Sequence, residues 1–306
     1  MMMVGGIIPK NPMTESAQAI VPPSSLTHQH ITAVVNTLLE NAQHRGTVRI
    51  LDLGCGNAWL LHHMMVAFEV LRPAIRFDFF GLDVSDAGQQ DTGYMNEAIR
   101  YLTEHYPDLP WRERLRLIPA TNRWPYSDEY FDFITNNQVM EHVFDHDFVF
   151  REIRRCLRPG GVSVNLFPLR EILWEGHAHM PIVHRIRDEK LRAQLMLLFA
   201  KTGFRKRYHR EMQRRGWTSL EEFARVFAHV LETDTNYISA RKLLDTARRA
   251  HLHASFTYTK DFFIAKALSF MGCRPYRYRN VGYLESLAFF FGRYLSSITL
   301  LLRRIG

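Results

Sequence analysis

The stretch Ile50-Leu-Asp-Leu-Gly-Cys-Gly-Asn57 decides the fold class of this chain. Its first four residues are apolar apart from one acid, which is typical of a buried strand. The two glycines that follow allow positive φ angles and let a ligand approach the backbone closely. An apolar helical pattern then runs from about Trp59 to Val70. The glycines therefore lie at a strand-to-helix turn, where the unpaired N–H groups of the helix start can contact a ligand.

Two kinds of nucleotide ligand compete for this turn. A nicotinamide dinucleotide site would have a third glycine where this chain has Trp59, and the Asp52 carboxylate would repel a pyrophosphate. The same carboxylate suits the cationic sulfonium and ammonium groups of S-adenosylmethionine. Asp83, in Gly81-Leu-Asp-Val-Ser85, comes about one βαβ unit later, where an acid ending a strand accepts hydrogen bonds from ribose hydroxyls. Read alone, Asp83 would be a cap or turn residue.

Strand and helix patterns alternate along most of the chain. Apolar positions of residues 31–39 form one stripe of a helix, and further helices are expected over 89–105 and 148–157. Strands are expected over 48–53, 75–82, 115–118, 130–134 and 162–167. Near-continuous apolar strands alternating with helices indicate an α/β, doubly wound, mostly parallel sheet covered on both faces. After residue 167 the strand pattern stops, and Ser219-Leu-Glu-Glu222 has the form of a capping box. Strands are expected again near 254–259 and 295–302.

This pattern predicts four parts of the chain. They are a flexible lead-in over 1–25, a cofactor-binding core over 26–167, a helical insert over 168–250 that covers the acceptor site, and a C-terminal completion of the sheet over 251–306. The apolar stretch 284–302 is interrupted by Arg293 and two serines, so a buried last strand is favoured over a membrane segment.

Composition narrows the class of protein. With 46% apolar residues in 306, the chain can bury a full core. Cys55, Cys156 and Cys273 have no metal-ligand or disulfide-framework spacing, and the start lacks a signal peptide, so we expect a cytoplasmic protein. The net charge of +8 favours an acidic partner, which leaves a phosphorylated substrate, an anionic membrane surface or RNA open.

Residues 48–167 resemble the class I S-adenosylmethionine-dependent methyltransferase family, close to the ubiquinone/menaquinone-type methyltransferase domain. The resemblance rests on five pieces in the family's order and spacing: ILDLGCGN, GLDVS, WPYSDEYFDFI, QVMEHV and REIRRCLRPGG. It implies a Rossmann-like sheet of seven strands with an antiparallel last strand, S-adenosylmethionine as cofactor, and methyl transfer as the reaction.

The resemblance also assigns cofactor-binding residues. The first motif surrounds the methionine part of the cofactor, the acid of the second motif holds the ribose, and its neighbours flank the adenine. Ala120 stands where the family often has an acid for the adenine amino group, so Thr121 or the backbone must replace it. The residues after the fourth strand lie where the methionine end meets the acceptor. The predicted set is Asp52, Gly54, Cys55, Gly56, Asp83, Val84, Thr121 and Asn137.

Four histidines are candidates for a catalytic base, because transfer to an oxygen acceptor would need one. They are His142, His177, His179 and His184. The alternatives are that Glu141 and His142 form the first turn of the next helix, and that the loop histidines lie on the surface. Some relatives associate a Glu-x-x-Glu-His arrangement with a metal, but Gln138 takes its first position here, and no metal site is predicted.

The acceptor class stays open at the sequence level. We expect O-methylation of a small or carrier-linked metabolite, with phosphorylated acceptors included. The basic run from His184 to Arg215 is either a solvated helical face or a lid that meets phosphate groups on the acceptor or on anionic lipid. The alternatives are a membrane-surface methyltransferase of a lipid or isoprenoid-linked acceptor, and a non-catalytic RNA-binding or scaffold protein. The chain has no RNA-recognition signature, which counts against nucleic acid.

Overall fold

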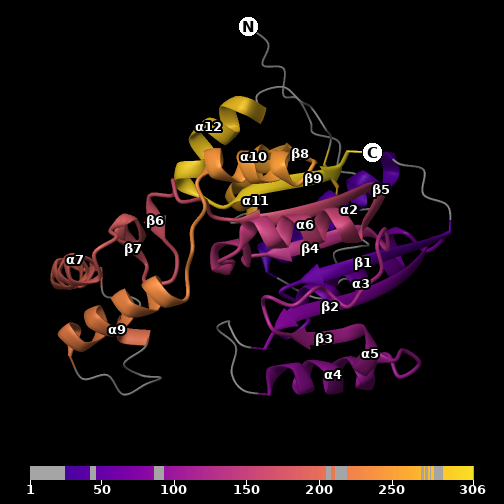
Figure 1. Cartoon of the computed structure of the whole chain (residues 1–306), viewed down its shortest axis with the longest axis horizontal. Coiled ribbons are helices and arrows are strands. Elements are labelled where there is room, and N and C mark those ends of the chain that lie inside the picture. The colour runs from indigo at the N-terminus through magenta and orange to yellow at the C-terminus, as the bar shows by residue number, and fades with distance from the viewer. Residues whose placement is uncertain are drawn as a thin grey trace, which may run out of the picture.

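The computed structural model describes residues 25–41, 46–85, 93–204, 208–210, 219–269, 272, 275, 277–278 and 285–305. In this part of the chain, one seven-stranded sheet has the order β3-β2-β1-β4-β5-β9-β8 (Figure 1). Its strands are β1 (Thr47–Leu53), β2 (Arg76–Val84), β3 (Leu115–Ile118), β4 (Phe131–Asn137), β5 (Leu157–Phe167), β8 (Leu252–Ser255) and β9 (Ile298–Arg304).

The first five strands are parallel, and β9 runs antiparallel between β5 and β8. This topology confirms the expected Rossmann-like fold with its antiparallel last strand. The order reverses between β1 and β4, so the carboxyl ends of these two strands border a crevice in which such sheets bind ligands.

The predicted start of β5 was wrong in one detail. Arg158-Pro-Gly-Gly161 was expected to end a helix, but the strand already begins at Leu157. The pairing of β4 with β5 shifts register between Phe131 and Phe133, and this irregularity accommodates the extra residues. The last strand also begins later than expected, because residues up to Leu295 form a helix.

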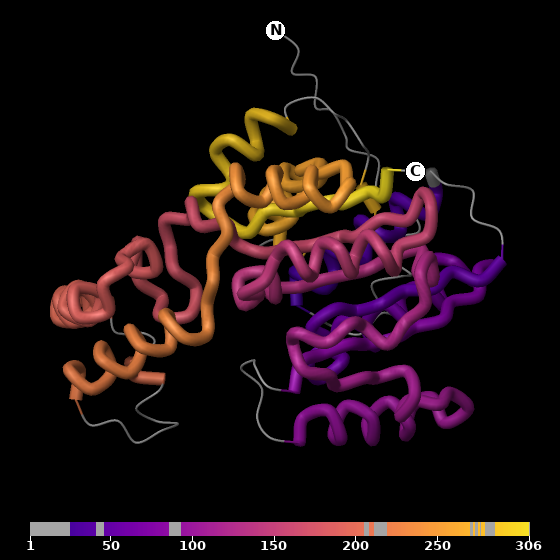
Figure 2. Tube along the Cα trace, viewed as in Figure 1, coloured from indigo at the N-terminus to yellow at the C-terminus, as the bar shows by residue number. Residues whose placement is uncertain are grey.

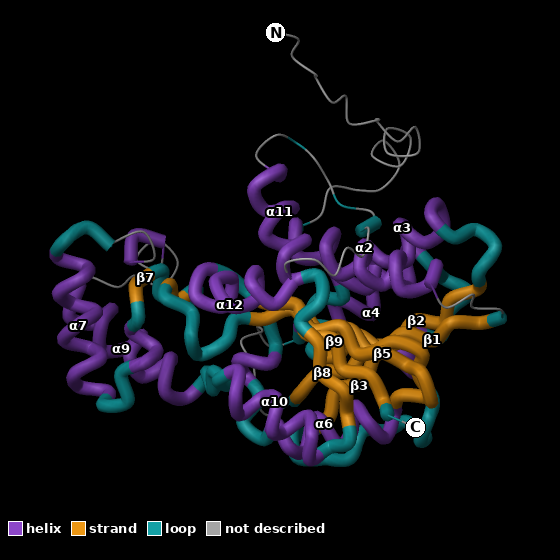
Figure 3. Tube along the Cα trace, turned by 90° about the horizontal axis from the view of Figure 1, so that it is seen from above, coloured by secondary structure: helices purple, strands orange, loops and turns teal. Residues whose placement is uncertain are grey.

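Helices cover both faces of the sheet (Figure 3). One face carries α2 (Leu26–Asn41), α3 (Trp59–Leu71), α4 (Tyr94–His105) and α11 (Thr259–Ser269), which share one hydrophobic cluster with the short helix α5 (Trp111–Arg114). The other face carries α6 (His146–Cys156) and α10 (Ala240–Arg249), which share a second cluster. α12 (Glu285–Leu295) packs against α11.

Helix α2 is tied to the end of the sheet by a buried histidine. Its apolar positions at residues 31–39 are buried, as the stripe predicts. The ring nitrogens of His30 lie 2.7 Å from the Tyr278 hydroxyl and 2.8 Å from the Thr299 hydroxyl of β9. Burial lowers the pKa of His30 to about 3, so the ring is neutral at ordinary pH.

Between β5 and α10 the chain forms a separate lobe beside the sheet (Figures 1 and 2). The lobe contains a short hairpin of β6 (Trp174–Glu175) and β7 (Met180–Pro181), followed by α7 (Glu189–Lys201) and α9 (Leu220–Thr233). α7 packs on α9 around a hydrophobic core of its own. The Ser219 hydroxyl accepts a hydrogen bond from the Glu222 N–H at 3.0 Å, as the capping box predicts. The hairpin was not expected from the sequence.

No helix among the described residues combines the length and the apolar character that crossing a bilayer requires.

Candidate active site

A cavity of about 320 Å³ lies where β1, β2 and β4 end. Its wall joins the glycine turn, the end of β2, the loop after β3 and the segment between β4 and α6. The lining residues are Leu53, Gly54, Leu82, Asp83, Val84, Tyr94, Ile118, Ala120, Thr121, Trp124, Asn137, Gln138, Val139, His142, Val143, Phe144, Asp145 and Val149. Five of the eight predicted cofactor-binding residues are in this list, and they come from four separate segments.

The glycine turn is packed too closely for side chains. Gly54 has a φ of 71°, and a Cβ placed on it would collide with the Val139 side chain. Its N–H donates to the Leu82 carbonyl at 2.7 Å, which fixes the turn against β2. Ala58, at the start of α3, also adopts a left-handed φ of 59°. Glycine is therefore required at residue 54, and the backbone of the turn borders the cavity with no side chain in between.

Asp83 is held at the cavity wall by backbone donors. One carboxylate oxygen accepts from the Gly56 N–H at 2.7 Å and the other from the Val84 N–H at 2.8 Å. The Tyr94 hydroxyl donates to the same carboxylate. Burial still raises the Asp83 pKa above its usual range, despite these three donors. Each oxygen has a second lone pair, so the carboxylate can also accept from a pair of ligand hydroxyls.

Asp52 lies beneath the turn rather than in the cavity lining. It is 2% exposed, and the Thr135 hydroxyl donates to its carboxylate at 3.0 Å. Burial raises its pKa to about 7, the hydrogen bond from Thr135 opposes this, and the charge of Asp83 adds to the rise. Asp52 therefore lies behind the cavity wall, and its predicted role towards a cationic ligand stays a prediction. Cys55 and Gly56 are likewise outside the lining.

Asn137 shows that the wall is built for a polar ligand. Its Nδ2 donates to the Thr27 hydroxyl at 3.2 Å, but its buried Oδ1 has no hydrogen-bond partner among the described residues. A buried acceptor without a donor costs stability, so a ligand that donates there would be favoured. With the side-chain-free turn at Gly54 and the carboxylate of Asp83, these residues fit S-adenosylmethionine, which carries an ammonium group and ribose hydroxyls.

Six polar side chains gather beside the cavity, and we call them the histidine cluster: Glu141, His142, Glu175, His177, His184 and Tyr237. His142 lines the cavity and belongs to a 3-10 turn, Met140–His142, that precedes α6. It is therefore not in the first turn of the helix. Its Nδ1 donates to the Asp234 carbonyl at 2.6 Å, which defines the tautomer because a carbonyl only accepts.

Glu175 organises the insert side of the histidine cluster. It accepts from His177 Nδ1 at 2.6 Å and from the Tyr237 hydroxyl at 2.8 Å. Its carboxylate is fully buried. Burial alone would raise its pKa, but the hydrogen bond and charge of His177, with the backbone N–H groups of Ala178 and His177, lower it to about 2, so the group is ionised. The His177 ring meets His142 edge-on at 5.1 Å between centroids.

Two further members of the histidine cluster, His184 and Glu141, have little contact with solvent. His184 packs on Tyr237 with ring centroids 4.7 Å apart. Glu141 is 1% exposed, and burial raises its pKa to about 7. His179 lies two residues after His177, at a left-handed φ of 55°, outside the histidine cluster as defined. No three Cys, His, Asp or Glu side chains of the described residues are grouped to hold a metal.

Part of the basic run has a structural role. Arg192 is buried and donates to the carbonyls of Ile186 and Ala228 and to Glu232. Arg185 donates to the carbonyls of Glu171 and Ile172. Arg192 therefore joins α7 to α9 within the lobe, and Arg185 joins the lobe to the segment that follows β5. Arg205, Lys206, Arg207, Arg214 and Arg215 lie outside the described residues.

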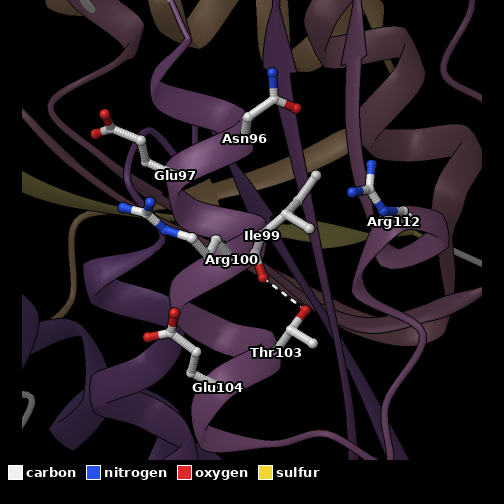
Figure 4. A pocket seen from close by; sticks show the side chains of 7 residues that line it. All are labelled: Asn96, Glu97, Ile99, Arg100, Thr103, Glu104 and Arg112. Atoms are coloured by element: carbon white, nitrogen blue, oxygen red, sulfur yellow. Dashed lines mark hydrogen bonds between the residues drawn. The ribbon is translucent and has the colours of Figure 1, made fainter.

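A second hollow, of about 770 Å³, lies on α4 and α5 (Figure 4). It is lined by Asn96, Glu97, Ile99, Arg100, Thr103, Glu104 and Arg112. None of these residues lines the cavity beside the glycine turn, and none was predicted as a site residue.

The sequence missed several residues of the site. Tyr94 and Trp124 line the cavity, and Tyr237 completes the histidine cluster. Trp124 belongs to the WPYSDEYFDFI piece, so that motif carried a usable signal. Tyr237 and His177 both donate to Glu175, although they are about 60 residues apart in the sequence. Tyr237 lies in a stretch without a motif, and nothing in the sequence indicated its role.

The doubly wound sheet, with a cavity beside the glycine turn, is an α/β fold of the kind that binds nucleotides. A family model described as a methyltransferase domain matches residues 26–228. The chain belongs to this family and is an S-adenosylmethionine-dependent methyltransferase. The family assignment confirms the prediction that the chain is an enzyme, and it disfavours the alternative of a non-catalytic RNA-binding or scaffold protein.

Several solved structures are similar to this chain. PKMT2 from Rickettsia typhi is 13% identical, with a TM-score of 0.50 over 92% of this chain and 54% of that one. A putative sarcosine dimethylglycine methyltransferase from Galdieria sulphuraria is 15% identical, with a TM-score of 0.45 over 91% and 85%. A geranyl diphosphate methyltransferase is 16% identical, with a TM-score of 0.44 over 90% and 78%. No curated protein matches this chain in sequence.

Proposed function

We propose that this methyltransferase transfers the methyl group to an oxygen atom of a small or carrier-linked acceptor, with His142 as the base. One observation carries the proposal: the Nδ1–H of His142 is engaged by the Asp234 carbonyl at 2.6 Å, in a ring that lines the cavity. Nε2 is therefore the unprotonated nitrogen, and it is the atom that can accept a proton from a hydroxyl.

The surroundings keep His142 neutral before the reaction. Burial lowers its pKa below the usual value, and the hydrogen bond to Asp234 opposes this. A neutral ring at ordinary pH is the form that a base requires. The ionised Glu175 nearby favours the charged form, so it stabilises the imidazolium that follows proton transfer.

The bound cofactor supplies an electrophilic methyl group on a positively charged sulfur. The protein's own residues have three tasks. Asp83 holds the ribose and the glycine turn surrounds the methionine part of the cofactor. The apolar side chains of Val143 and Val149 limit access of water, and His142 takes the acceptor proton at Nε2.

The lobe is proposed to cover the acceptor site. Three members of the histidine cluster, Glu175, His177 and His184, come from the segment after β5, while His142 comes from the core. The acceptor would then meet residues of both parts. Within the predicted insert 168–250, α10 packs on the sheet, so the proposed cover is the part that precedes it. We propose that the protein acts in the cytoplasm.

The test compares His142→Gln with wild type on panels of hydroxyl and amine acceptors, measuring S-adenosylhomocysteine formation against pH. We expect kcat for hydroxyl acceptors to fall by about 10²–10³ and the acid limb of the pH profile to disappear. Donor affinity, measured by calorimetry, should be unchanged. His229→Gln on the lobe surface, whose side chain is 63% exposed, is the matched control. Unchanged O-methylation by His142→Gln, or activity on amines alone, would refute the proposal.

A further inference from the structure

Helix α12 presents two different faces. Gly292 and Ser296 are buried, and a Cβ on Gly292 would lie 3.5 Å from the Phe263 ring of α11. On the opposite side Leu287, Phe290, Phe291 and Leu295 are 52%, 52%, 57% and 58% exposed. We call these four side chains the apolar face of α12. Exposing large apolar side chains such as phenylalanine and leucine to water costs free energy.

The exposed apolar surface continues from α12 onto the lobe. The Leu173 N–H donates to the Tyr294 carbonyl at 2.8 Å, which joins the end of α12 to the segment before β6. Leu173 and Trp174 are 44% and 43% exposed. Exposed apolar side chains on neighbouring segments, one of them a tryptophan, are typical of a surface that meets a partner.

Cations accompany this surface. The Arg293 guanidinium lies 5.1 Å from the centre of the Phe290 ring, and no carboxylate pairs with it among the described residues. Lys266 Nζ lies 3.4 Å from the Ser296 hydroxyl at the end of α12. The partner should therefore be apolar at its centre and negatively charged at its edge.

We propose that the apolar face of α12 docks on an anionic lipid bilayer, with Phe290 and Phe291 inserted among the acyl chains and Arg293 and Lys266 at the headgroup phosphates. An anionic bilayer offers the required apolar interior below a layer of negative charge. A second copy of the chain fits less well, because a two-fold contact through α12 would bring like cations together.

Docking would bring the bilayer close to the active-site cavity. Gln138, which lines the cavity, donates to the Ser297 hydroxyl at 3.0 Å, and Ser297 lies two residues beyond Leu295 of the apolar face. An amphipathic acceptor dissolved in the membrane would then approach this side of the cavity. The acceptor class rests on the proposed function, but the docking does not, because vesicle binding is measured without any reaction.

The experiment is co-sedimentation of the full chain with vesicles of phosphatidylcholine alone, and with about one lipid in three replaced by phosphatidylglycerol. We expect binding to the anionic vesicles only, weakened on going from about 0.1 M to about 1 M salt, which shortens the Debye length from about 10 Å to about 3 Å. Phe290→Ser combined with Phe291→Ser should lower the vesicle affinity at least about tenfold. Arg293→Gln with Lys266→Gln should remove the preference for anionic lipid.

The matched control is Leu191→Ser with Leu198→Ser on α7, whose side chains are 53% and 55% exposed. This pair should bind vesicles as wild type does. All variants should keep the wild-type Tm and donor affinity. The proposal is overturned if wild type does not bind anionic vesicles, or if the phenylalanine pair binds them unchanged. It is also overturned if that pair only converts a dimer to a monomer in sedimentation velocity.

Discussion

Replacing Gly54 with alanine tests the packing of the glycine turn. The residue has a left-handed φ of 71°, and a Cβ there would collide with the side chain of Val139. Two separate costs follow. A left-handed conformation costs a non-glycine residue about 1–2 kcal/mol. Forcing a methyl group into a packed contact costs about 1–3 kcal/mol more.

The smaller conformational freedom of alanine in the unfolded chain returns about 0.4–1 kcal/mol. We therefore expect Gly54→Ala to lower the free energy of unfolding by about 2–4 kcal/mol, read from equilibrium urea unfolding. Donor affinity should fall as well, because Gly54 lines the cavity and the turn must shift away from Val139.

Gly93 provides the matched control. Its φ is 89°, it precedes α4, and a Cβ on it would meet no atom within 4 Å. Gly93→Ala should therefore show the backbone cost alone, about 1 kcal/mol. Adding Val139→Ala to Gly54→Ala should recover the steric part, seen as a favourable coupling of about 1–3 kcal/mol in a double-mutant cycle. If Gly54→Ala costs no more than Gly93→Ala, the close contact with Val139 does not exist.

Three further results follow from buried charge. The contribution of His30 to stability should fall as pH drops from about 6.5 towards 3, because the folded chain keeps its ring neutral while the unfolded chain binds the proton. Stability of His30→Gln should therefore depend less steeply on acidification than that of wild type in urea melts between pH 7 and 5. The raised pKa of Asp52 acts in the opposite sense, since the folded state holds a proton that the unfolded state loses, so stability falls as pH rises from about 4 to 7. Asp52→Asn should remove that dependence and weaken donor binding, measured by calorimetry, more at pH 8 than at pH 6. Arg155 donates to Glu152 and to the carbonyl of Trp124. Arg155→Lys should therefore lower the free energy of unfolding by about 2–4 kcal/mol in thermal unfolding, and it should reduce donor affinity because Trp124, which lines the cavity, is displaced. Wild-type stability and affinity in this variant would contradict the geometry.

The cofactor side of the site was predictable because its residues come from local motifs. The turn at Gly54 follows a strand directly, and Asp83 ends the neighbouring strand, so the topology of a parallel sheet brings them together. Patterns that span only a few residues are therefore enough to place Gly54 and Asp83 at the same edge of the sheet. Asp52 shows how far such local patterns can predict a site. Its position under the turn depends on a hydrogen bond from Thr135, which belongs to another strand.

The acceptor side could not be predicted to the same depth. The sequence singled out His142 and His177 as separate candidates, but their meeting depends on how the lobe folds back on the core. Tyr237 completes the contact with Glu175 across about 60 residues of chain, and no periodicity encodes that approach. The capping box at Ser219 was readable because it involves only neighbouring residues.

The position of β9 has a consequence for how the chain folds during synthesis. This strand lies between β5 and β8, and it also supplies the Thr299 hydroxyl for His30. While the ribosome is still making residues 298–304, β5 keeps an open edge that can pair with other chains. We therefore expect the sheet to close only after β9 has left the ribosome, so that folding intermediates are most prone to aggregate just before that moment.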